Sequence, residues 1–344
     1  MKIASLPLSP SHASPPIKRN VYCQKVYNFF KMIVLVIKNT LHLSNYKIIS
    51  INTDKVSPEL FKQLKKFEDS FTYPFSEQER FRIKHGTNGD YFAFFKQLGK
   101  VHCYVAICKK DETIKKMIDG KEVIITRKKG EIAAVACGIL RTLRTPNGKS
   151  IKAWYICDLK VKENYQGTHL PFMFMQKAAW RFFQCPRGFG ICMNPQDGKP
   201  KAAELWKKHA PISGSNTQVL NLYTLDAEQA KKYKENIETL LRNHGYMLKD
   251  EHLALHSTTG SKDYEIFNEE TKEKKAWQLL HMRPSATEGY KPIKDGTHMI
   301  STYAGSPLDS ELKDILHLSP SSTAQFVSYG MKNFDPNLIT SNQI

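Results

Sequence analysis

The residues Gln166-Gly167-Thr168-His169-Leu170-Pro171 lie between two apolar stretches of the chain. We expect the stretch 151–161 to be a strand and a helix to begin at Pro171, because proline is favoured at the first helical position. The first turn of a helix has N–H groups without intrahelical partners, and its dipole is positive at that end. A glycine turn that leads into a helix can therefore hold an anion such as a pyrophosphate. An ordinary strand-to-helix loop is the alternative.

Two other groups of residues have the types that carry chemistry, and neither predicts a metal site. His252 and His256 have i,i+4 spacing, but no H-E-x-x-H glutamate accompanies them and their segment reads as a strand. The seven cysteines are an odd number, contain no C-x-x-C and lie mostly in apolar, strand-like runs. We therefore expect reduced thiols in a cytoplasmic compartment, with neither a disulfide framework nor a zinc site.

The segment from Cys157 to Gly167, CDLKVKENYQG, carries a family resemblance. An apolar strand ends in L-x-V at Leu159 and Val161, a polar link and Tyr165 follow, and Gln166-Gly167 opens the glycine turn. Within its order of strand, hairpin, strand, helix and strand, this pattern resembles the GNAT superfamily of acyl-CoA-dependent N-acyltransferases. The resemblance covers the chain from roughly Tyr46 to Leu225.

The pyrophosphate-loop consensus of that family, Q/R-x-x-G-x-G/A, falls on Gln166, His169 and Pro171. Gln166 matches and Gly167 matches a common extra glycine, whereas His169 and Pro171 depart from the pattern. Proline has no N–H, although at the first helical position it removes only a group without an intrahelical partner. The resemblance implies that acetyl-CoA is the co-substrate, with no metal. The residues implied to contact it are Leu159, Val161, Gln166, Gly167, Thr168, His169, Leu170 and Asn194.

The implied reaction moves an acetyl or other acyl group directly to an amine, on a small molecule or a protein whose identity the sequence does not give. The amine must lose a proton, and Asp158 is the only acid on the strand that, by resemblance, lines the thioester. Asp158 is therefore the expected base, with a structural carboxylate bonded to a backbone N–H as the equal alternative. Glu131 is a weaker candidate. Tyr223 and His209 are the candidates for the acid, and each residue type is more often structural.

Trp206 stands where the family often has a tyrosine that protonates the departing thiolate, in the pattern Asn194…Ala203-Glu204-Leu205-Trp206. An indole N–H does not supply a proton in that way. Another group serves, the thiolate leaves unassisted, or the protein has changed its task. A catalytically silent module of the same fold, which binds a ligand or a protein, is therefore the alternative function.

Local signals predict the helices around these residues. Ser57-Pro58 predicts one helix start, and Ser76 with Glu79 forms a capping box that predicts another. The stretch 171–183 is apolar nearly all round, which predicts a buried helix.

The strands follow from turn signals. Asn147-Gly148 predicts a hairpin between strands 132–143 and 151–161. We therefore predict an α/β (α+β) fold, with a mixed, mostly antiparallel central sheet and helices on both faces. Four segments are expected: a basic, partly disordered 1–45, the GNAT-like domain 46–225, a C-terminal α+β extension or lid 226–318, and a polar tail 319–344.

Charge and hydropathy restrict the partners. The 344 residues contain 51 Lys+Arg and 33 Asp+Glu, a net charge of +18, which favours anionic partners in general. Lys231, Lys232 and Lys234 form only a solvated helix face, so nucleic acid is not an expected partner. No apolar run approaches the roughly 18 residues of a membrane span, so no transmembrane segment is expected.

Overall fold

The structure is a computed structural model in which residues 44–344 form one compact unit. It describes residues 45–74, 79–86, 89–118, 120–145, 147–194, 204, 216–257, 262–277, 279–285, 297–331, 334–339 and 341. The predicted disordered segment therefore lies outside the described residues up to residue 44, and so do Trp206 and His209.

A ten-stranded sheet forms the centre of this unit. Its strands, in spatial order, are β1 (Tyr46–Ile51), β4 (Lys100–Cys108), β7 (Ile132–Arg144), β8 (Ser150–Val161), β9 (Gly188–Met193), β16 (Ser322–Tyr329), β10 (Asn216–Leu225), β15 (Thr297–Tyr303), β14 (Leu279–Ser285) and β11 (His252–Ser257). Neighbouring strands are antiparallel except β8 with β9 and β14 with β15. The predicted mixed, mostly antiparallel sheet is confirmed.

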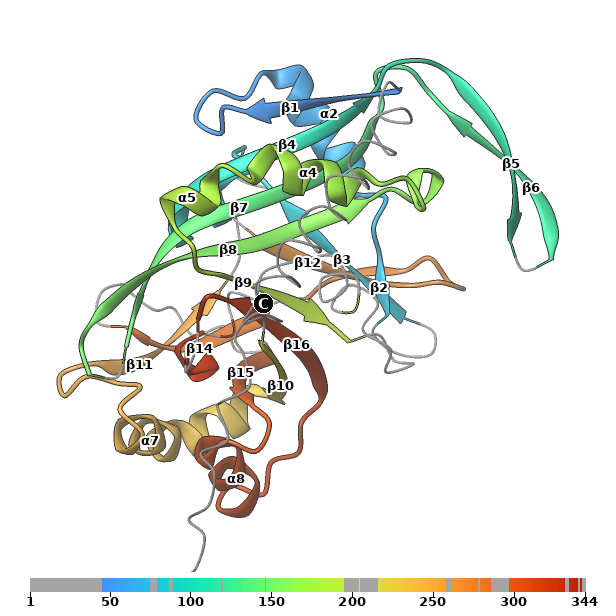
Figure 1. The fold of residues 1–344 in the computed structure, drawn as a ribbon. Coiled ribbons are helices and arrows are strands. Elements are labelled where there is room, and N and C mark those ends of the chain that lie inside the picture. Colours follow the sequence, from blue (N-terminus) through green and yellow to red (C-terminus); the bar gives the residue numbers. More distant parts are fainter. Residues whose placement is uncertain are drawn as a thin grey trace, which may run out of the picture. The chain divides into compact units, whose positions relative to one another are not determined.

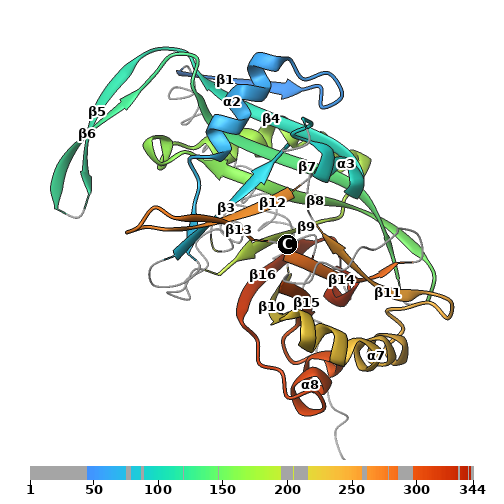
Figure 2. The same cartoon turned by 180° about the vertical axis from the view of Figure 1, so that it is seen from behind.

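Helices cover both faces of the sheet (Figures 1 and 2). On one face, α2 (Pro58–Glu68) and α3 (Ala93–Leu98) pack against β7 through a core that includes Leu64, Phe67 and Phe95. On the other face, α4 (Leu170–Ala178) and α5 (Arg181–Gln184) follow β8. Ser57 caps α2 as predicted, because its side chain accepts a hydrogen bond from the Leu60 N–H.

The hairpin predicted from Asn147-Gly148 is confirmed. β7 and β8 pair from Arg144 opposite Ser150 to Ala134 opposite Val161. Gly148 has a φ of 76°, which a residue without Cβ adopts at little cost.

The single buried helix predicted over 171–183 is wrong in two respects. The helix breaks between α4 and α5 at Ala179 and Trp180. Trp180 is 50% exposed and Phe183 is 92% exposed. Only one side of α4, including Leu170 and Phe174, contacts the sheet core, so an apolar sequence here did not mean burial all round.

The second predicted helix is also wrong, because Glu79 begins the strand β3 (Glu79–His85). β3 belongs to a four-stranded sheet with β2 (Tyr73–Pro74), β12 (Lys262–Asn268) and β13 (Lys274–Trp277). Phe81 and Ile83 pack on Tyr264, Leu222 and Met299, and Arg80, Arg82 and Lys84 alternate with them. This period of two fits a strand with one covered face.

The C-terminal extension continues the main sheet and adds its own core. Helices α7 (Ala227–Asn243) and α8 (Pro307–Asp314) pack on β10 and β15 through residues such as Leu240, Leu312 and Ile300. The capping box of Asp226 and Gln229 begins α7.

The predicted polar tail 319–344 contains a central strand, so that prediction is wrong. β16 pairs antiparallel with both β9 and β10. Phe326, Val327 and Tyr329 are each 1% exposed. The short helix η3 (Pro336–Leu338) follows. The tail prediction failed because residues on both faces of β16 are buried, so this strand belongs to the interior of the protein.

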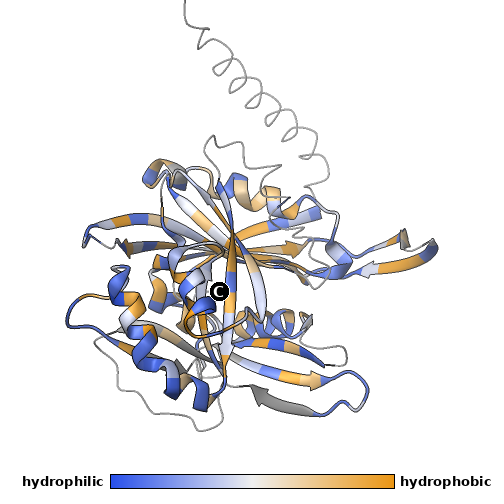
Figure 3. Cartoon of the chain, turned by 90° about the horizontal axis from the view of Figure 1, so that it is seen from below, coloured by the Kyte–Doolittle hydropathy of each residue, from blue (hydrophilic) through white to orange (hydrophobic). Residues whose placement is uncertain are grey.

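A hairpin of β5 (Glu112–Ile118) and β6 (Lys121–Arg127) projects beyond the main sheet (Figure 1). Met117 is 63% exposed and Ile124 is 65% exposed, so this hairpin carries both hydrophobic and polar residues on its surface (Figure 3). Among the described residues, no helix is long and apolar enough to cross a membrane.

Candidate active site

The parallel strands β8 and β9 pair over a short distance and then part (Figure 1). Their pairing runs from Trp154 opposite Gly188 to Ile156 opposite Gly190, whereas β8 continues to Val161. From Cys157 onward, the edge of β8 that faces β9 has no strand partner there among the described residues. A ligand that reaches this edge can therefore bind its backbone groups.

A β-bulge lies where the two strands part. On β7, Val135 pairs with Lys160 and Cys137 pairs with Cys157, so Asp158 and Leu159 together face a single residue. Asp158 has a φ of 51°, in the left-handed region that asparagine and aspartate tolerate better than most residues. The bulge turns the Asp158 side chain toward the face that α2 covers, where Glu68 contacts its ion-pair partner.

Asp158 belongs to a buried ionic group. Its Oδ1 lies 2.6 Å from the Nζ of Lys160, and the same Nζ lies 2.5 Å from Glu68 Oε1. Side-chain exposures are 4% for Asp158, 10% for Lys160 and 3% for Glu68. Asp158 Oδ2 is buried and has no hydrogen-bond partner among the described residues. The group therefore contains one buried carboxylate oxygen that has no donor among the described residues.

Burial and neighbouring charges shift the pKa values of Glu68 and Lys160. Burial raises the pKa of Glu68, an effect that Lys160 opposes. Burial lowers the pKa of Lys160, but Asp158 and Glu68 outweigh it and hold that pKa well above its usual value. Tyr91 donates a hydrogen bond to Glu68 Oε2 at 3.1 Å. Lys160 is therefore a cation at neutral pH, held between two acids.

Glu68, His85 and Asp158 have the spacing of a possible metal site, since their ligand atoms all lie within 4.8 Å of one another. The ammonium of Lys160 already contacts both carboxylates. A metal ion bound there would have to displace this ammonium, because like charges repel at such distances.

The predicted pyrophosphate loop connects β8 to α4. Gly167 has a φ of 80°, and an added Cβ would meet no atom within 4 Å, so the loop has open space at this point. Three of its five N–H groups have acceptors within the loop region: those of Gln166, Thr168 and Leu170. The N–H groups of Gly167 and His169 have no acceptor among the described residues. Gln166, Gly167 and His169 are exposed, and Leu170 is buried.

The short helix η2 (Glu163–Tyr165) directly precedes this loop and is held in place by side-chain contacts. Tyr165 donates a hydrogen bond to Glu131 Oε2 at 2.7 Å, and Lys162 pairs with Glu131 Oε1. Arg127 donates from Nε to the carbonyl of Asn164 at 2.9 Å and so joins the β5–β6 hairpin to the same support. Although burial raises the pKa of Glu131, the bonds from Lys162 and Tyr165 outweigh it and lower the pKa. Glu131 is thus a structural acid rather than a base.

The other predicted cofactor contacts lie along the parted strands. Leu159 is 41% exposed and Val161 is half-buried near the end of β8. Asn194 follows β9 and donates from Nδ2 to Thr323 Oγ1 at 2.8 Å. Its Oδ1 is buried and has no hydrogen-bond partner among the described residues. Both sides of the parting therefore carry predicted contact residues.

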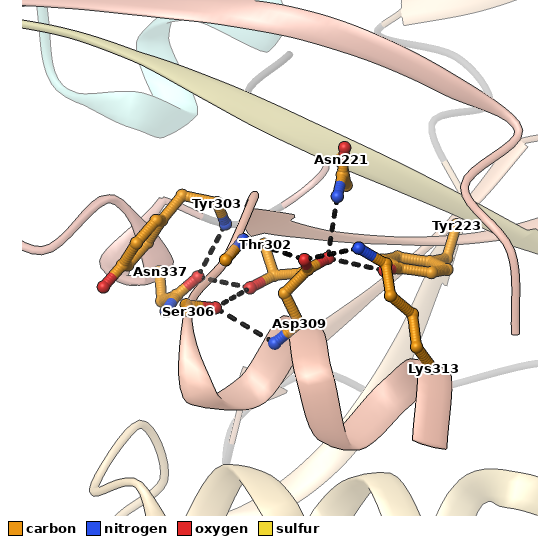
Figure 4. A network of polar contacts seen from close by, with 9 residues as sticks. Asn221, Tyr223, Thr302, Tyr303, Ser306, Asp309, Lys313 and Asn337 are labelled. Carbon is orange, nitrogen blue, oxygen red and sulfur yellow. Dashed lines mark hydrogen bonds and ion pairs between the residues drawn. The ribbon is translucent and has the colours of Figure 1, made fainter. Parts of the chain in front are cut away.

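Tyr223, a predicted acid, lies in a different polar network (Figure 4). Its hydroxyl donates to Asp309 Oδ1 at 2.5 Å, and Asn221 Nδ2 donates to the same oxygen at 2.8 Å. Tyr223 is fully buried among the side chains of α7 and α8, and burial raises its pKa. The structure does not bring Tyr223 together with Asp158, and His209 lies outside the described residues.

The sequence prediction missed Glu68, Lys160, His85 and Tyr91. Two signals could have found the first two. Glu68 lies one helical turn after Leu64 on the apolar side of α2, where an acid needs a partner. Lys160 stands between Leu159 and Val161 on the strand that carries Asp158.

The chain matches no family model and no curated protein. It is similar to the solved structure of NAA60 from Arabidopsis thaliana in complex with acetyl-CoA, with a TM-score of 0.31 and 12% identity over 50% of this chain and 87% of that one. N-myristoyltransferase from Saccharomyces cerevisiae with bound myristoyl-CoA has a TM-score of 0.40 and 12% identity, over 83% of this chain and 79% of that one. A tandem GNAT protein from the clavulanic acid biosynthesis pathway has a TM-score of 0.37 and 9% identity, over 82% and 98%. At such low scores and identities, these similarities assign neither a family nor an activity.

Proposed function

We propose that this chain is an acyl-CoA-dependent N-acyltransferase that moves the acetyl group of acetyl-CoA to an amine in a ternary complex. The observation that carries the proposal is the parting of β8 from β9 at a bulge that bears Asp158. The same strand then leads into a glycine turn and a helix N-terminus. The proposed base, Asp158, and the proposed pyrophosphate loop at Gly167 thus follow one another along the chain. A co-substrate with a thioester at one end and a pyrophosphate at the other needs both.

The residues fit such a co-substrate at three points. In the proposal, the N–H groups of Gly167 and His169 bind the pyrophosphate, because both lack an acceptor among the described residues. Asn194 Oδ1 accepts a hydrogen bond from an amide N–H of the pantetheine arm. Leu159 and Val161 line the acyl end from β8. Gln166, Thr168 and Leu170 shape the loop.

The proposed step needs one base. The amine nitrogen attacks the thioester carbonyl carbon, a C–N bond forms, the C–S bond breaks, and coenzyme A leaves as the thiolate. The proton that the amine releases goes to Asp158, directly or through a water. Tyr223 is not proposed as a donor to the thiolate, because its hydroxyl is bonded to Asp309. We also propose a cytoplasmic location, consistent with the free thiols of the described cysteines.

Binding is tested with a charge-specific pair of variants. Gly167→Asp places a carboxylate in the open space beside the proposed pyrophosphate, whereas Gly167→Asn has a similar size and tolerates positive φ without the charge. Like charges about 4 Å apart near a protein surface repel by about 1–4 kcal/mol, so we expect Gly167→Asp to weaken acetyl-CoA binding about tenfold or more. Calorimetry should show a much smaller loss for Gly167→Asn. Equal affinity in wild type and Gly167→Asp would refute the proposed loop.

Turnover is tested by free-CoA release with acetyl-CoA and a panel of primary amines, small molecules and peptides included. Asp158→Asn keeps the size and tolerates the backbone conformation while removing the base. We expect kcat to fall by about 10²–10⁴ with acetyl-CoA affinity unchanged. If the wild type binds acetyl-CoA yet acylates no amine, the chain is instead the catalytically silent binding module.

A further inference from the structure

Lys160 bridges two acids in the interior of the protein. Its ammonium lies 2.6 Å from Asp158 Oδ1 and 2.5 Å from Glu68 Oε1, and it also hydrogen-bonds the hydroxyl of Tyr73. By contrast, Lys115 and Glu122 on the projecting hairpin form a pair with side-chain exposures of 70% and 54%. Solvent screens an exposed pair, whereas a buried one fixes the position and charge of its members.

The geometry of the bridge leaves the two oxygens of Asp158 unequal. Lys160 binds Oδ1, while Oδ2 has no hydrogen-bond partner among the described residues. Asp158 is also in the left-handed conformation at a bulge, which surrounding contacts must stabilise. Glu68 reaches Lys160 from α2, an element separate from β8, so the ammonium is held from both sides.

We propose that Lys160, anchored by Glu68, is a positioning residue that holds Asp158 so that its Oδ2 faces the acceptor amine. This inference rests on the proposed acyltransferase function. A cation bound to one carboxylate oxygen fixes the direction in which the other oxygen points. Lys160 acts through Asp158 and contacts neither substrate itself.

The groups that face Asp158 come from several elements. Glu68 lies on α2, Tyr73 on β2, His85 on β3, Tyr91 just before α3 and Cys137 on β7. Burial raises the pKa of Tyr91 well above its usual value, and a hydrogen bond with Cys103 together with burial does the same for Cys137. Lys160, whose pKa is held well above its usual value, is a cation between Asp158 and Glu68 at neutral pH. Its removal leaves two carboxylates that repel each other and hold a proton more tightly.

The main variant is Lys160→Met, with Lys115→Met as a matched control that breaks an exposed Lys–Glu pair. We expect Lys160→Met to lower kcat by about 10²–10⁴, as loss of the base does, without changing acetyl-CoA affinity by calorimetry. The acid limb of the pH–kcat profile should move to higher pH. Lys115→Met should match wild type in all three measurements.

Three further variants separate positioning from a purely structural role. Asp158→Asn/Lys160→Met should be no slower than Asp158→Asn alone, because residues that act as a unit are not additive. Lys160→Arg keeps the cation and should return the acid limb toward its wild-type pH. Glu68→Gln keeps Lys160 charged but loosens it, so kcat falls without the shift to higher pH. A structural role predicts less folded enzyme in circular dichroism and an unchanged pH profile.

Each outcome decides between the claims. If the wild type turns over and Lys160→Met has the same kcat and acid limb, the positioning role is wrong and the acyltransferase proposal remains. If kcat losses in Asp158→Asn and Lys160→Met multiply in the double variant, Lys160 acts independently and the role is also wrong. If the wild type shows no turnover, both proposals fail. If Lys160→Met does not fold, Glu68→Gln/Lys160→Met removes the opposite charges together and replaces it in the same assays.

Discussion

At the scale of single residues, the chemistry depends on where polar side chains are buried. Asp158 could be singled out from the sequence because it is the only acid on its strand. The contact between Glu68 and Lys160 could not be predicted, because these residues are far apart in the chain and meet only after α2 packs on the sheet. The bulge at Asp158 was equally invisible, since strand alternation alone gives no sign of an extra residue.

The Tyr223 network shows the same limit, because a residue type that suits catalysis here serves the fold. Asp309 is 1% exposed and accepts hydrogen bonds from Asn221 and Tyr223, from the Gly305 N–H at 2.9 Å and from Lys313 at 2.7 Å. Because four donors surround the Asp309 carboxylate, its negative charge strengthens each of these hydrogen bonds. Tyr223 is therefore committed to joining β10 to α8 (Figure 4).

We predict that Asp309→Asn lowers the free energy of unfolding by about 1.5–3 kcal/mol at pH 7, the value of hydrogen bonds to a buried charge. Burial raises the pKa of Asp309, but the bonds from Lys313, Tyr223, Asn221 and Gly305 outweigh it and lower that pKa. A lowered pKa gives stability that is complete above the unfolded value of about 3.9 and is lost as pH falls through the folded value. The deficit of the variant should therefore shrink below about pH 4 in urea unfolding. A deficit that grows toward acid pH would contradict the prediction, and the exposed Asp314→Asn is the control.

At the scale of elements, local signals succeeded where the partner is near in sequence. Asn147-Gly148 placed β7 and β8 because the turn and both strands lie within one stretch. Ser76 and Glu79 misled, although the alternation of Phe81, Ile83 and His85 with basic residues has the period of a strand. Besides the short β2, β3 pairs over its whole length with β12, which is far along the chain.

The pairing of β9 with β16 is unusually close at one point. A Cβ on Gly188 would lie 2.2 Å from the hydroxyl oxygen of Tyr329 and 2.3 Å from its Cζ. Only a residue without a side chain allows the Tyr329 ring to lie across β9 there. The glycine therefore helps to fix which strand is the neighbour of β9.

We predict that Gly188→Ala destabilises the protein by about 1–3 kcal/mol, the usual cost of overpacking a buried site. Denaturant unfolding should show a smaller cost when Tyr329→Leu is already present, since the ring is then absent. Gly138→Ala is the matched control on β7, because its Cβ would meet Trp154 at an ordinary 3.7 Å. Equal stability of Gly188→Ala and wild type would show that Tyr329 does not pack as described.

At the scale of the whole molecule, one continuous sheet contains strands from both the predicted domain 46–225 and the predicted extension 226–318. β10 pairs with β15 and β16, so strand pairing crosses the predicted boundary after Leu225. The second sheet likewise combines β3 with β12. The general class of fold could be predicted from the central hairpin and the helix signals. The pairing of C-terminal strands with strands from earlier in the chain could not, because no local sequence pattern shows which distant strand will be the partner.

The order β9–β16–β10 places a strand from the C-terminal region between two strands that precede it in the chain. We predict that a chain ending at Leu318 lacks a cooperative thermal transition and aggregates, whereas a chain ending at Ser341, which keeps all the described elements, unfolds like wild type. Phe326, Val327 and Tyr329 are each 1% exposed, and burying each such side chain contributes about 1.5–3 kcal/mol. Their loss, together with two unpaired strand edges, is comparable to a total stability of about 5–15 kcal/mol. Scanning calorimetry and size-exclusion chromatography of the two chains provide the measurement. A soluble, cooperatively folded chain ending at Leu318 would mean that β9 and β10 do not need β16 between them, and that residues after 318 are a tail after all.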